Sequence, residues 1–168
     1  ETLSVHAYRD GPEPLLLRYR DDEVSAVSAA ITQMCESRRL PHSHCVVLAR
    51  TRAMTLRIAD GLPNAMRARS MASKDFDITH AGVKVTTFHA AKGLEFPIVV
   101  VAGLADGVFP YSSADGDPDK IREGRRLLFV ASSRATQQLA FVAPMDNPSR
   151  FLDYIDRDQW LIKDHSPD

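Results

Sequence analysis

Two continuous apolar runs constrain the fold of this 168-residue chain more than any other feature. Cys45–Ala49 reads CVVLA and Pro97–Ala102 reads PIVVVA, without the alternation of a strand that keeps one face in water. Strands buried on both faces are typical of parallel sheets that helices cover on each side. Helical periodicity recurs between the strand-like segments, as in the stretch that carries Val24, Val27 and Ile31. The pattern therefore predicts an α/β domain with a mostly parallel sheet and helices on both faces.

The remaining segments fit the same layered scheme. Further strands are predicted at Leu3–Tyr8, Leu15–Tyr19, Val83–Phe88 and Gln138–Ala143. Further helices are predicted at Thr51–Leu62, Asp119–Arg134 and Pro148–Ile155. We expect one domain over residues 1–155 and a charged C-terminal tail over residues 156–168.

Composition narrows the classes of function. Lys plus Arg number 21 against 22 Asp plus Glu, and this balance argues against an autonomous, strongly basic nucleic-acid binder. No apolar stretch approaches the roughly 20 residues of a membrane span. Cys35 and Cys45 do not form a disulfide framework, so we expect a reducing, cytoplasmic environment. His42 and His44 lack a second ligand pair at zinc spacing, so we expect no metal site.

Two segments carry most of the functional signal. Thr87–Glu95 reads TFHAAKGLE, and Glu123–Thr136 reads EGRRLLFVASSRAT. The first segment follows a predicted strand, at the carboxyl end where ligands gather in open parallel sheets. There Gly93 permits a tight turn, and Glu95 could accept hydrogen bonds from sugar hydroxyls. A lone Lys-Gly-x-Glu would be an ordinary exposed turn, but the longer run TFHAAKGLEFPIVVVAGL is far more specific.

Both segments resemble the fifth and sixth motifs of superfamily 1 DNA helicases of the UvrD/Rep/PcrA group. The resemblance covers roughly Val46 to Leu152 and implies the second RecA-like motor domain, with a RecA-like P-loop NTPase fold. No G-x-x-x-x-G-K-[ST] loop occurs in the sequence. The resemblance therefore implies a domain that completes an ATP site in trans, with Mg²⁺ held mainly by an upstream RecA-like domain of the same polypeptide.

The resemblance also implies roles for particular residues. Arg134 matches the arginine that reaches the γ-phosphate, where a planar guanidinium stabilises charge on the transferring phosphoryl group. Glu95 matches the acidic residue at the ribose, with Gly93 beside it. Arg126 belongs to a pair of arginines at the start of the motif helix, and a structural ion pair is the favoured alternative for it.

Three residues match positions that face single-stranded DNA in the family. Thr87 and His89 match the junction between the ATP site and the DNA channel. Arg50 lies in a segment that resembles motif IVa, although a generic strand that ends at an arginine explains it equally well.

The chain departs from the family pattern at several positions, among them Ala49 and Arg52 in the segment that resembles motif IVa. Gly124, Phe129 and Ser133 replace the common Glu, Tyr and Thr of the sixth motif. In addition, only about twenty residues separate Leu62 from Val83, where long members of the group insert an accessory helical domain. We therefore expect no accessory helical insertion.

Two hypotheses remain open from the sequence. The first is a motor domain of an ATP-dependent DNA helicase or translocase, which would not hydrolyse ATP alone. The second is a degenerate helicase module that acts as a protein or DNA scaffold without catalysis. The presence of Arg134 and Glu95 favours the first.

Overall fold

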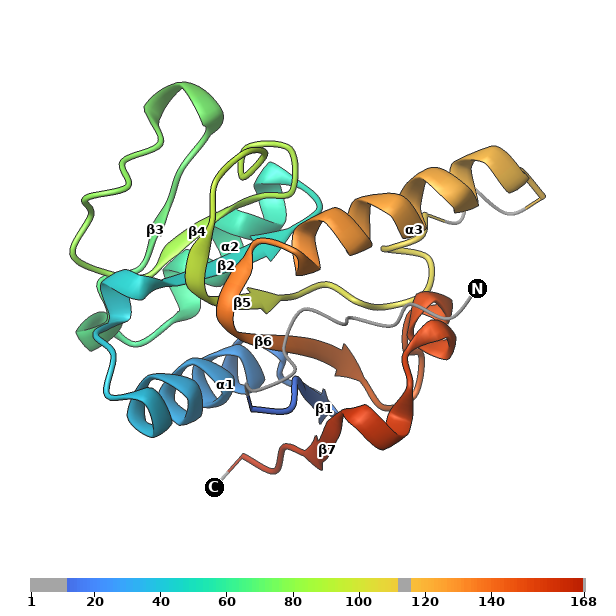
Figure 1. Cartoon of the computed structure of the whole chain (residues 1–168), viewed down its shortest axis with the longest axis horizontal. Coiled ribbons are helices and arrows are strands. Elements are labelled where there is room, and N and C mark those ends of the chain that lie inside the picture. Colours follow the sequence, from blue (N-terminus) through green and yellow to red (C-terminus); the bar gives the residue numbers. More distant parts are fainter. Residues whose placement is uncertain (1–11, 112–115, 168) are drawn as a thin grey trace.

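The computed structural model describes residues 12–111 and 116–167, and its centre is a seven-stranded sheet in the order β3-β4-β2-β5-β6-β1-β7 (Figure 1). Every strand pairing is parallel. The strands are β1 Leu15–Tyr19, β2 Cys45–Ala49, β3 Arg69–Ser70, β4 Lys84–Thr87, β5 Phe96–Val101, β6 Ala135–Pro144 and β7 Leu161–Asp164. The predicted parallel α/β architecture is confirmed, while the predicted strand Leu3–Tyr8 lies outside the described residues.

The three α-helices begin at side-chain caps that the sequence supplies. They are α1 Glu23–Arg38, α2 Arg52–Gly61 and α3 Pro118–Ser132. Asp22 accepts from the amide of Ser25, and Thr51 accepts from that of Met54. Such caps satisfy amide groups that have no partner within the helix. Each helix therefore starts within a residue or two of its predicted position.

The continuous apolar runs become strands that are buried on both faces. Along β2, Val47 packs in a cluster with α1 and α2, whereas Val46 and Leu48 pack in the cluster that contains α3. Successive residues of β5 divide between the two clusters in the same way. Helices thus cover both faces of the sheet, as predicted.

The C-terminal residues add to the sheet. The predicted helix over Pro148–Ile155 is a 3₁₀ helix, η5, over Arg150–Tyr154. A second short 3₁₀ helix, η6, spans Arg157–Gln159, and β7 then pairs in parallel with β1. Trp160 is buried, with its ring centroid 4.6 Å from that of Phe141. The segment expected to be a charged tail therefore contributes an edge strand and a core side chain.

The interval between α2 and β4 is short and irregular. It holds the 3₁₀ helices η2 Asn64–Met66 and η3 Ser73–Asp75, with β3 between them. Residues 62–83, all of them described, contain no α-helix. The expected absence of a helical insertion therefore agrees with the structure of this interval.

Candidate functional site

A short crossover links the carboxyl end of β4 to the amino end of β5. The carboxyl edge is the side of the sheet where the parallel strands end, and the amino edge is the side where they begin. β4 ends at Thr87 and β5 begins at Phe96, and both strands run in the same direction on either side of β2. Residues 88–95 must therefore travel from the carboxyl edge of the sheet to its amino edge. Phe88 and Ala91 are buried in the cluster that contains α3, so the crossover lies on that face.

The amino edge brings together Glu95 and Arg134. The amide of Phe96 donates to the carbonyl oxygen of Arg134 at 2.8 Å, and Phe96 pairs with Ala135 in the sheet. The two predicted nucleotide-contacting residues thus occupy neighbouring backbone positions, each just before a paired strand residue. Glu95 is exposed, while Arg134 is half-buried and its Nε donates to the carbonyl oxygen of Val130 at 3.2 Å.

Gly93 shapes the end of the crossover. Its φ is +82°, in the left-handed region that favours glycine. A Cβ built at Gly93 would have nothing within 4 Å. Backbone conformation, rather than a close approach by other protein atoms, is therefore what demands glycine here, and the surrounding space is open at the edge that carries Glu95.

The carboxyl edge carries Arg50 and His89. Arg50 directly follows β2, and His89 is the second residue after the end of β4. Both line a pocket of about 260 Å³, whose other lining residues are Pro110, Tyr111, Lys120, Glu123, Gly124 and Leu127. Thr87 instead closes the adjacent turn, because its hydroxyl accepts from the amide of Ala90 at 3.3 Å.

The predicted site residues are therefore divided between opposite edges. The rule that ligands gather at carboxyl strand ends predicts that the segment Thr87–Glu95 lies at that end of the sheet. The structure places Thr87 and His89 at one edge and Gly93 and Glu95 at the other. The rule applies only to residues at the carboxyl ends of strands. Here a crossover without a helix takes the second half of the motif to the amino ends.

Arg126 lies exposed in the middle of α3. The ion pairs found on this helix are at its N-terminal end, where Lys120 faces Asp117 and Arg122 faces Asp119. The neighbouring Arg125 places its guanidinium 4.9 Å from the ring centroid of Tyr154. Arg125, the first of the paired arginines, is therefore held by contact with the Tyr154 ring.

Tyr111, at the carboxyl edge, was missed by sequence reasoning. The guanidinium carbon of Arg50 lies 3.5 Å from the centroid of the Tyr111 ring and 5.4 Å from that of Phe109. Tyr111 directly follows the Gly-x-Phe-Pro turn, which is the signal that could have drawn attention to it. Arg50 thus meets an aromatic pair rather than solvent alone.

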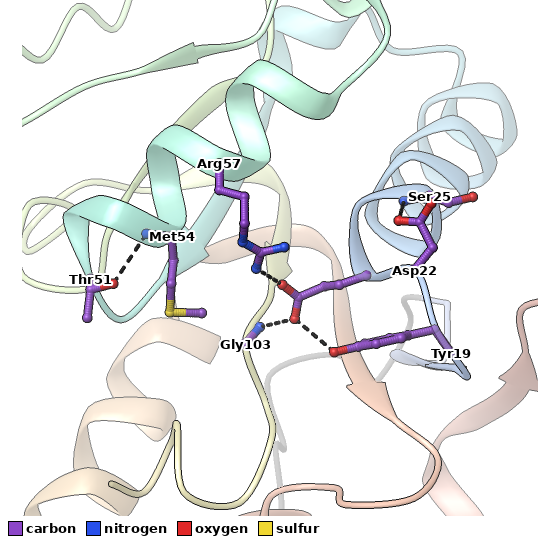
Figure 2. Close-up of polar contacts among 8 residues, drawn as sticks. Tyr19, Asp22, Ser25, Thr51, Met54, Arg57 and Gly103 are labelled. Atoms are coloured by element: carbon purple, nitrogen blue, oxygen red, sulfur yellow. Dashed lines mark hydrogen bonds and ion pairs between the residues drawn. The ribbon is translucent and has the colours of Figure 1, made fainter.

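A buried carboxylate anchors the loop that leads to Tyr111 (Figure 2). Glu23, at the start of α1, accepts from Arg57 of α2 at 2.5 Å and from the amide of Gly103 at 3.0 Å. The hydroxyl of Tyr19 donates to the same carboxylate at 3.2 Å, and burial is the main cause that raises the pKa of Tyr19. Because Gly103 is the second residue after the end of β5, this network fixes where the loop leaves the sheet.

The far side of the loop is held by an ion pair. Arg150 donates to both carboxylate oxygens of Asp106, through Nε and Nη2, at 2.8 Å each. These bonds hold the pKa of the Asp106 carboxyl below its usual range. The hydroxyl of Ser149 also donates to the carbonyl oxygen of Phe109. The loop over residues 103–111 is therefore tied to α1 at one end and to η5 at the other.

Gly124 has a packing explanation. A Cβ at this position of α3 would lie 2.9 Å from the ring of Phe151, which is fully buried. The larger Glu of the family pattern would meet the same ring. Close packing of Phe151 against α3 therefore accounts for the departure at this position.

Two features are absent from the described residues. No group of three or more His, Cys, Asp or Glu side chains in residues 12–111 and 116–167 could hold a metal ion. In the same ranges, no helix combines the length and apolar character needed to cross a membrane.

Cys35 and Cys45 are both buried and free, and burial raises the pKa of the Cys45 thiol.

Comparison with known proteins identifies the group that this chain resembles. Residues 64–144 match the model of the UvrD-like helicase C-terminal domain. The ATP-dependent DNA helicase PcrA of Leuconostoc citreum is 48% identical over 88 residues, covering 46% of this chain and 12% of PcrA. The ATP-dependent DNA helicase Rep of Escherichia coli is 32% identical over 155 residues, covering 86% of this chain and 21% of Rep. The chain thus spans about a fifth or less of the length of these relatives.

Solved structures show the same fold. The C-terminal domain of a possible DNA helicase from Lactobacillus plantarum superposes with a TM-score of 0.69 at 20% identity, covering 92% of this chain and 87% of that one. Domain 2 of the DEAD-box helicase Mss116p, solved with an RNA duplex, gives a TM-score of 0.52 at 14% identity, covering 93% and 65% of the two chains. The predicted RecA-like fold is confirmed.

Proposed function

From its likeness to the UvrD-like helicase C-terminal domain, we propose that this chain is the second motor domain of an ATP-dependent DNA helicase or translocase. In this proposal an upstream RecA-like domain of the same polypeptide supplies the phosphate-binding loop and most of the Mg²⁺ coordination. The present chain completes the ATP site and contacts single-stranded DNA. A cytoplasmic location fits its two buried free thiols.

The crossover over residues 88–95 is the observation that carries the proposal. It joins the carboxyl edge, where Arg50 and His89 line a pocket, to the amino edge, where Glu95 lies beside Arg134. A motor must couple events at a nucleotide to events at DNA. Eight residues of continuous chain between two such edges offer a direct physical connection.

Each edge carries groups suited to its ligand. At the amino edge, the Arg134 guanidinium would stabilise negative charge that develops on a phosphoryl group during transfer. The Glu95 carboxylate would accept hydrogen bonds from ribose hydroxyls, and Gly93 leaves open space beside it. Bound ATP would supply the phosphoanhydride bond that is hydrolysed. The described residues would contact its ribose and its terminal phosphate, and the upstream domain would bind the rest. Arg126, exposed in α3, is a second candidate for the phosphates.

The carboxyl edge would hold the DNA. Arg50 and His89 can donate to phosphate oxygens, and Thr87 orders the turn between the strand and His89. The overall charge of −1 suits a domain that contributes a local DNA contact within a larger binding channel.

The proposal is tested by comparing the isolated chain with the parent polypeptide in a steady-state ATPase assay that contains single-stranded DNA. The chain alone should show no turnover above background, because it has no phosphate-binding loop. The parent should hydrolyse ATP faster when DNA is added. Turnover of about one per second or faster by the chain alone, within the usual enzyme range, would contradict the split site. A parent that neither hydrolyses ATP nor responds to DNA would favour the non-catalytic scaffold.

A further inference from the structure

We propose that Glu23 is a positioning residue for the DNA contact of Arg50, because its carboxylate joins the two segments that hold the Arg50 side chain. This inference rests on the proposed function and deepens it by naming a residue that lies outside both candidate motifs. Glu23 is the first residue of α1, far in sequence from either motif.

The first support is the burial of the carboxylate. An acidic residue in the first turn of a helix complements the helix dipole even when it is exposed to solvent. Glu23 occupies such a position in α1, yet it is only 8% exposed. A buried carboxylate is costly unless donors surround it, so the dipole of α1 alone does not explain this residue.

Three donors from three segments surround the carboxylate, and Figure 2 shows Arg57, Gly103 and Tyr19 converging on it. One carboxylate oxygen accepts a hydrogen bond from Nη2 of Arg57, which belongs to α2. The other oxygen accepts from the amide of Gly103 at 3.0 Å and from the hydroxyl of Tyr19 at 3.2 Å. Both oxygens are therefore used, and α2 and the loop over residues 103–111 are joined through one side chain.

The second support is the place of Arg50 between the same two segments. Arg50 directly precedes Thr51, the residue that caps α2. Its guanidinium carbon lies 3.5 Å from the ring centroid of Tyr111 and 5.4 Å from that of Phe109, and both rings belong to the loop. The backbone of Arg50 is therefore fixed to α2, whereas its side chain is held by the loop. The direction of the guanidinium depends on how these two segments lie relative to one another.

The loop and α2 also pack closely where Glu23 joins them. Gly103 has a φ of +74°, and a Cβ there would lie 2.1 Å from Cε of Met54, in the first turn of α2. The preceding amide, of Ala102, still donates to the sheet, at the carbonyl oxygen of Leu48. Gly103 is thus the first residue after this bond, and Glu23 holds its amide next to α2.

The loop is compact between Gly103 and the rings that contact Arg50. The amides of Val108 and Phe109 both donate to the carbonyl oxygen of Ala105, at 3.1 and 2.8 Å. The Phe109 side chain is only 1% exposed, so its ring moves with the loop and not independently of it. A change in the position of Gly103 should therefore reach Arg50.

The test compares the ATPase rates of the parent protein and its variants over a range of single-stranded DNA concentrations. Glu23→Gln keeps the size of the side chain but replaces one acceptor oxygen with an amide donor, so one attachment is lost. Arg57→Ala removes the attachment to α2 from the other partner. Because the Arg57 side chain is 54% exposed, this variant carries the test if Glu23→Gln does not fold.

Two control variants lie on the same helix. Glu36→Gln makes the same change of charge at an exposed position of α1. Ile31→Val removes one methylene from a fully buried side chain, so it lowers the stability of the domain. It leaves the three hydrogen bonds to Glu23 unchanged. The two controls therefore separate positioning from a loss of charge and from a loss of stability.

The positioning role predicts a change in one parameter. Glu23→Gln and Arg57→Ala should each raise the half-stimulating DNA concentration by about three- to tenfold, since a residue that acts through Arg50 costs no more than the Arg50 contact itself. The maximal rate and KM for ATP should stay within about twofold of wild type, because Glu95 and Arg134 lie at the amino edge. Both controls should match wild type.

A double variant shows whether Glu23 acts through Arg50. In the Arg50→Ala background, Glu23→Gln should cause no further rise, because the side chain that it positions is gone. Effects that simply multiply would mean that Glu23 does not position Arg50. The same conclusion follows if Glu23→Gln titrates like Glu36→Gln, or if Ile31→Val shifts the concentration equally, and in these cases the proposed function stands. If DNA does not stimulate the wild-type parent, the proposed function fails and the positioning role fails with it.

Discussion

Glu95 and Arg134 are neighbours at the amino ends of β5 and β6, yet their chemistry differs at the level of the single residue. A carboxylate on ribose hydroxyls contacts the ground state and the transition state alike. A guanidinium on the γ-phosphate acts mainly as charge develops during transfer. The two side chains should therefore have separable kinetic effects in the parent protein.

Glu95→Ala in the parent should raise KM for ATP by roughly tenfold to a hundredfold, because one charge-assisted hydrogen bond contributes about 1.5–3 kcal/mol. The value of kcat should change little, since the contact is uniform along the reaction. Steady-state kinetics give both constants. The effect should shrink for a triphosphate that lacks the ribose hydroxyls. A fall in kcat at constant KM would instead link Glu95 to DNA or to domain closure.

Gly124→Ala should lower the stability of the domain, although alanine is the better helix former. The gain in helix propensity is about 1 kcal/mol, whereas overpacking a close contact costs about 1–3 kcal/mol. The new Cβ would lie 2.9 Å from Phe151. Urea denaturation of Gly124→Ala, Phe151→Leu and the double variant gives the coupling between the two sites. Additive effects would show that Phe151 is not what excludes a side chain at Gly124.

At the scale of elements, the loop over residues 103–111 depends on its two attachments. The pKa of Asp106 is lowered, chiefly by hydrogen bonds from Arg150. A lowered carboxyl pKa contributes stability that is fully present above the unfolded value of about 3.9 and is lost as pH falls through the folded pKa. The attachment to η5 should therefore weaken in acid.

Asp106→Asn tests this attachment. Near neutral pH it should reduce the free energy of unfolding by about 1 kcal/mol, since a partly exposed bidentate pair lies between surface and buried pairs in strength. The difference from wild type should stay constant above about pH 5 and shrink as pH falls below about 4, toward the lowered pKa of the wild-type carboxyl. Denaturation at several pH values measures it. A difference that stays constant with pH would mean that the charge of Asp106 is not what stabilises the loop.

The elements that sequence reasoning predicted share a physical basis. β2 and β5 are buried on both faces, so their apolar runs are continuous, and α1 and α2 begin at capping side chains. The elements that were missed lack such local signals. β7 is largely exposed and exists because β1 offers an edge, and the Arg50–Tyr111 contact joins residues 61 positions apart. Tertiary context alone determines both.

The same limit applied to the candidate site. Its candidate residues were proposed from the resemblance, which did not predict that they lie at opposite ends of the strands. The motif is continuous in sequence, and a crossover usually contains a helix that reveals the change of edge. Here residues 88–95 cross through turns, of which Gly93 is the only residue with a positive φ. No periodic pattern in the sequence marks that path.

At the scale of the whole molecule, the central claim is that the two edges have separate tasks that the crossover connects. The amino edge should control the rate of hydrolysis, and the carboxyl edge should control the response to DNA. Substitutions at Arg134 and Arg50 should therefore change different parameters of one reaction, although both remove a single guanidinium.

The most direct measurement is the ATPase rate of the parent protein as a function of single-stranded DNA concentration, for wild type, Arg134→Ala and Arg50→Ala. Arg134→Ala should lower the maximal rate by about a thousandfold or more, as loss of an arginine at the γ-phosphate does elsewhere, with the half-stimulating DNA concentration little changed. Arg50→Ala should raise that concentration by roughly tenfold, with the maximal rate nearly intact. If Arg134→Ala retains a rate within about threefold of wild type, or if both variants alter the same parameter, the division of tasks between the two edges is wrong.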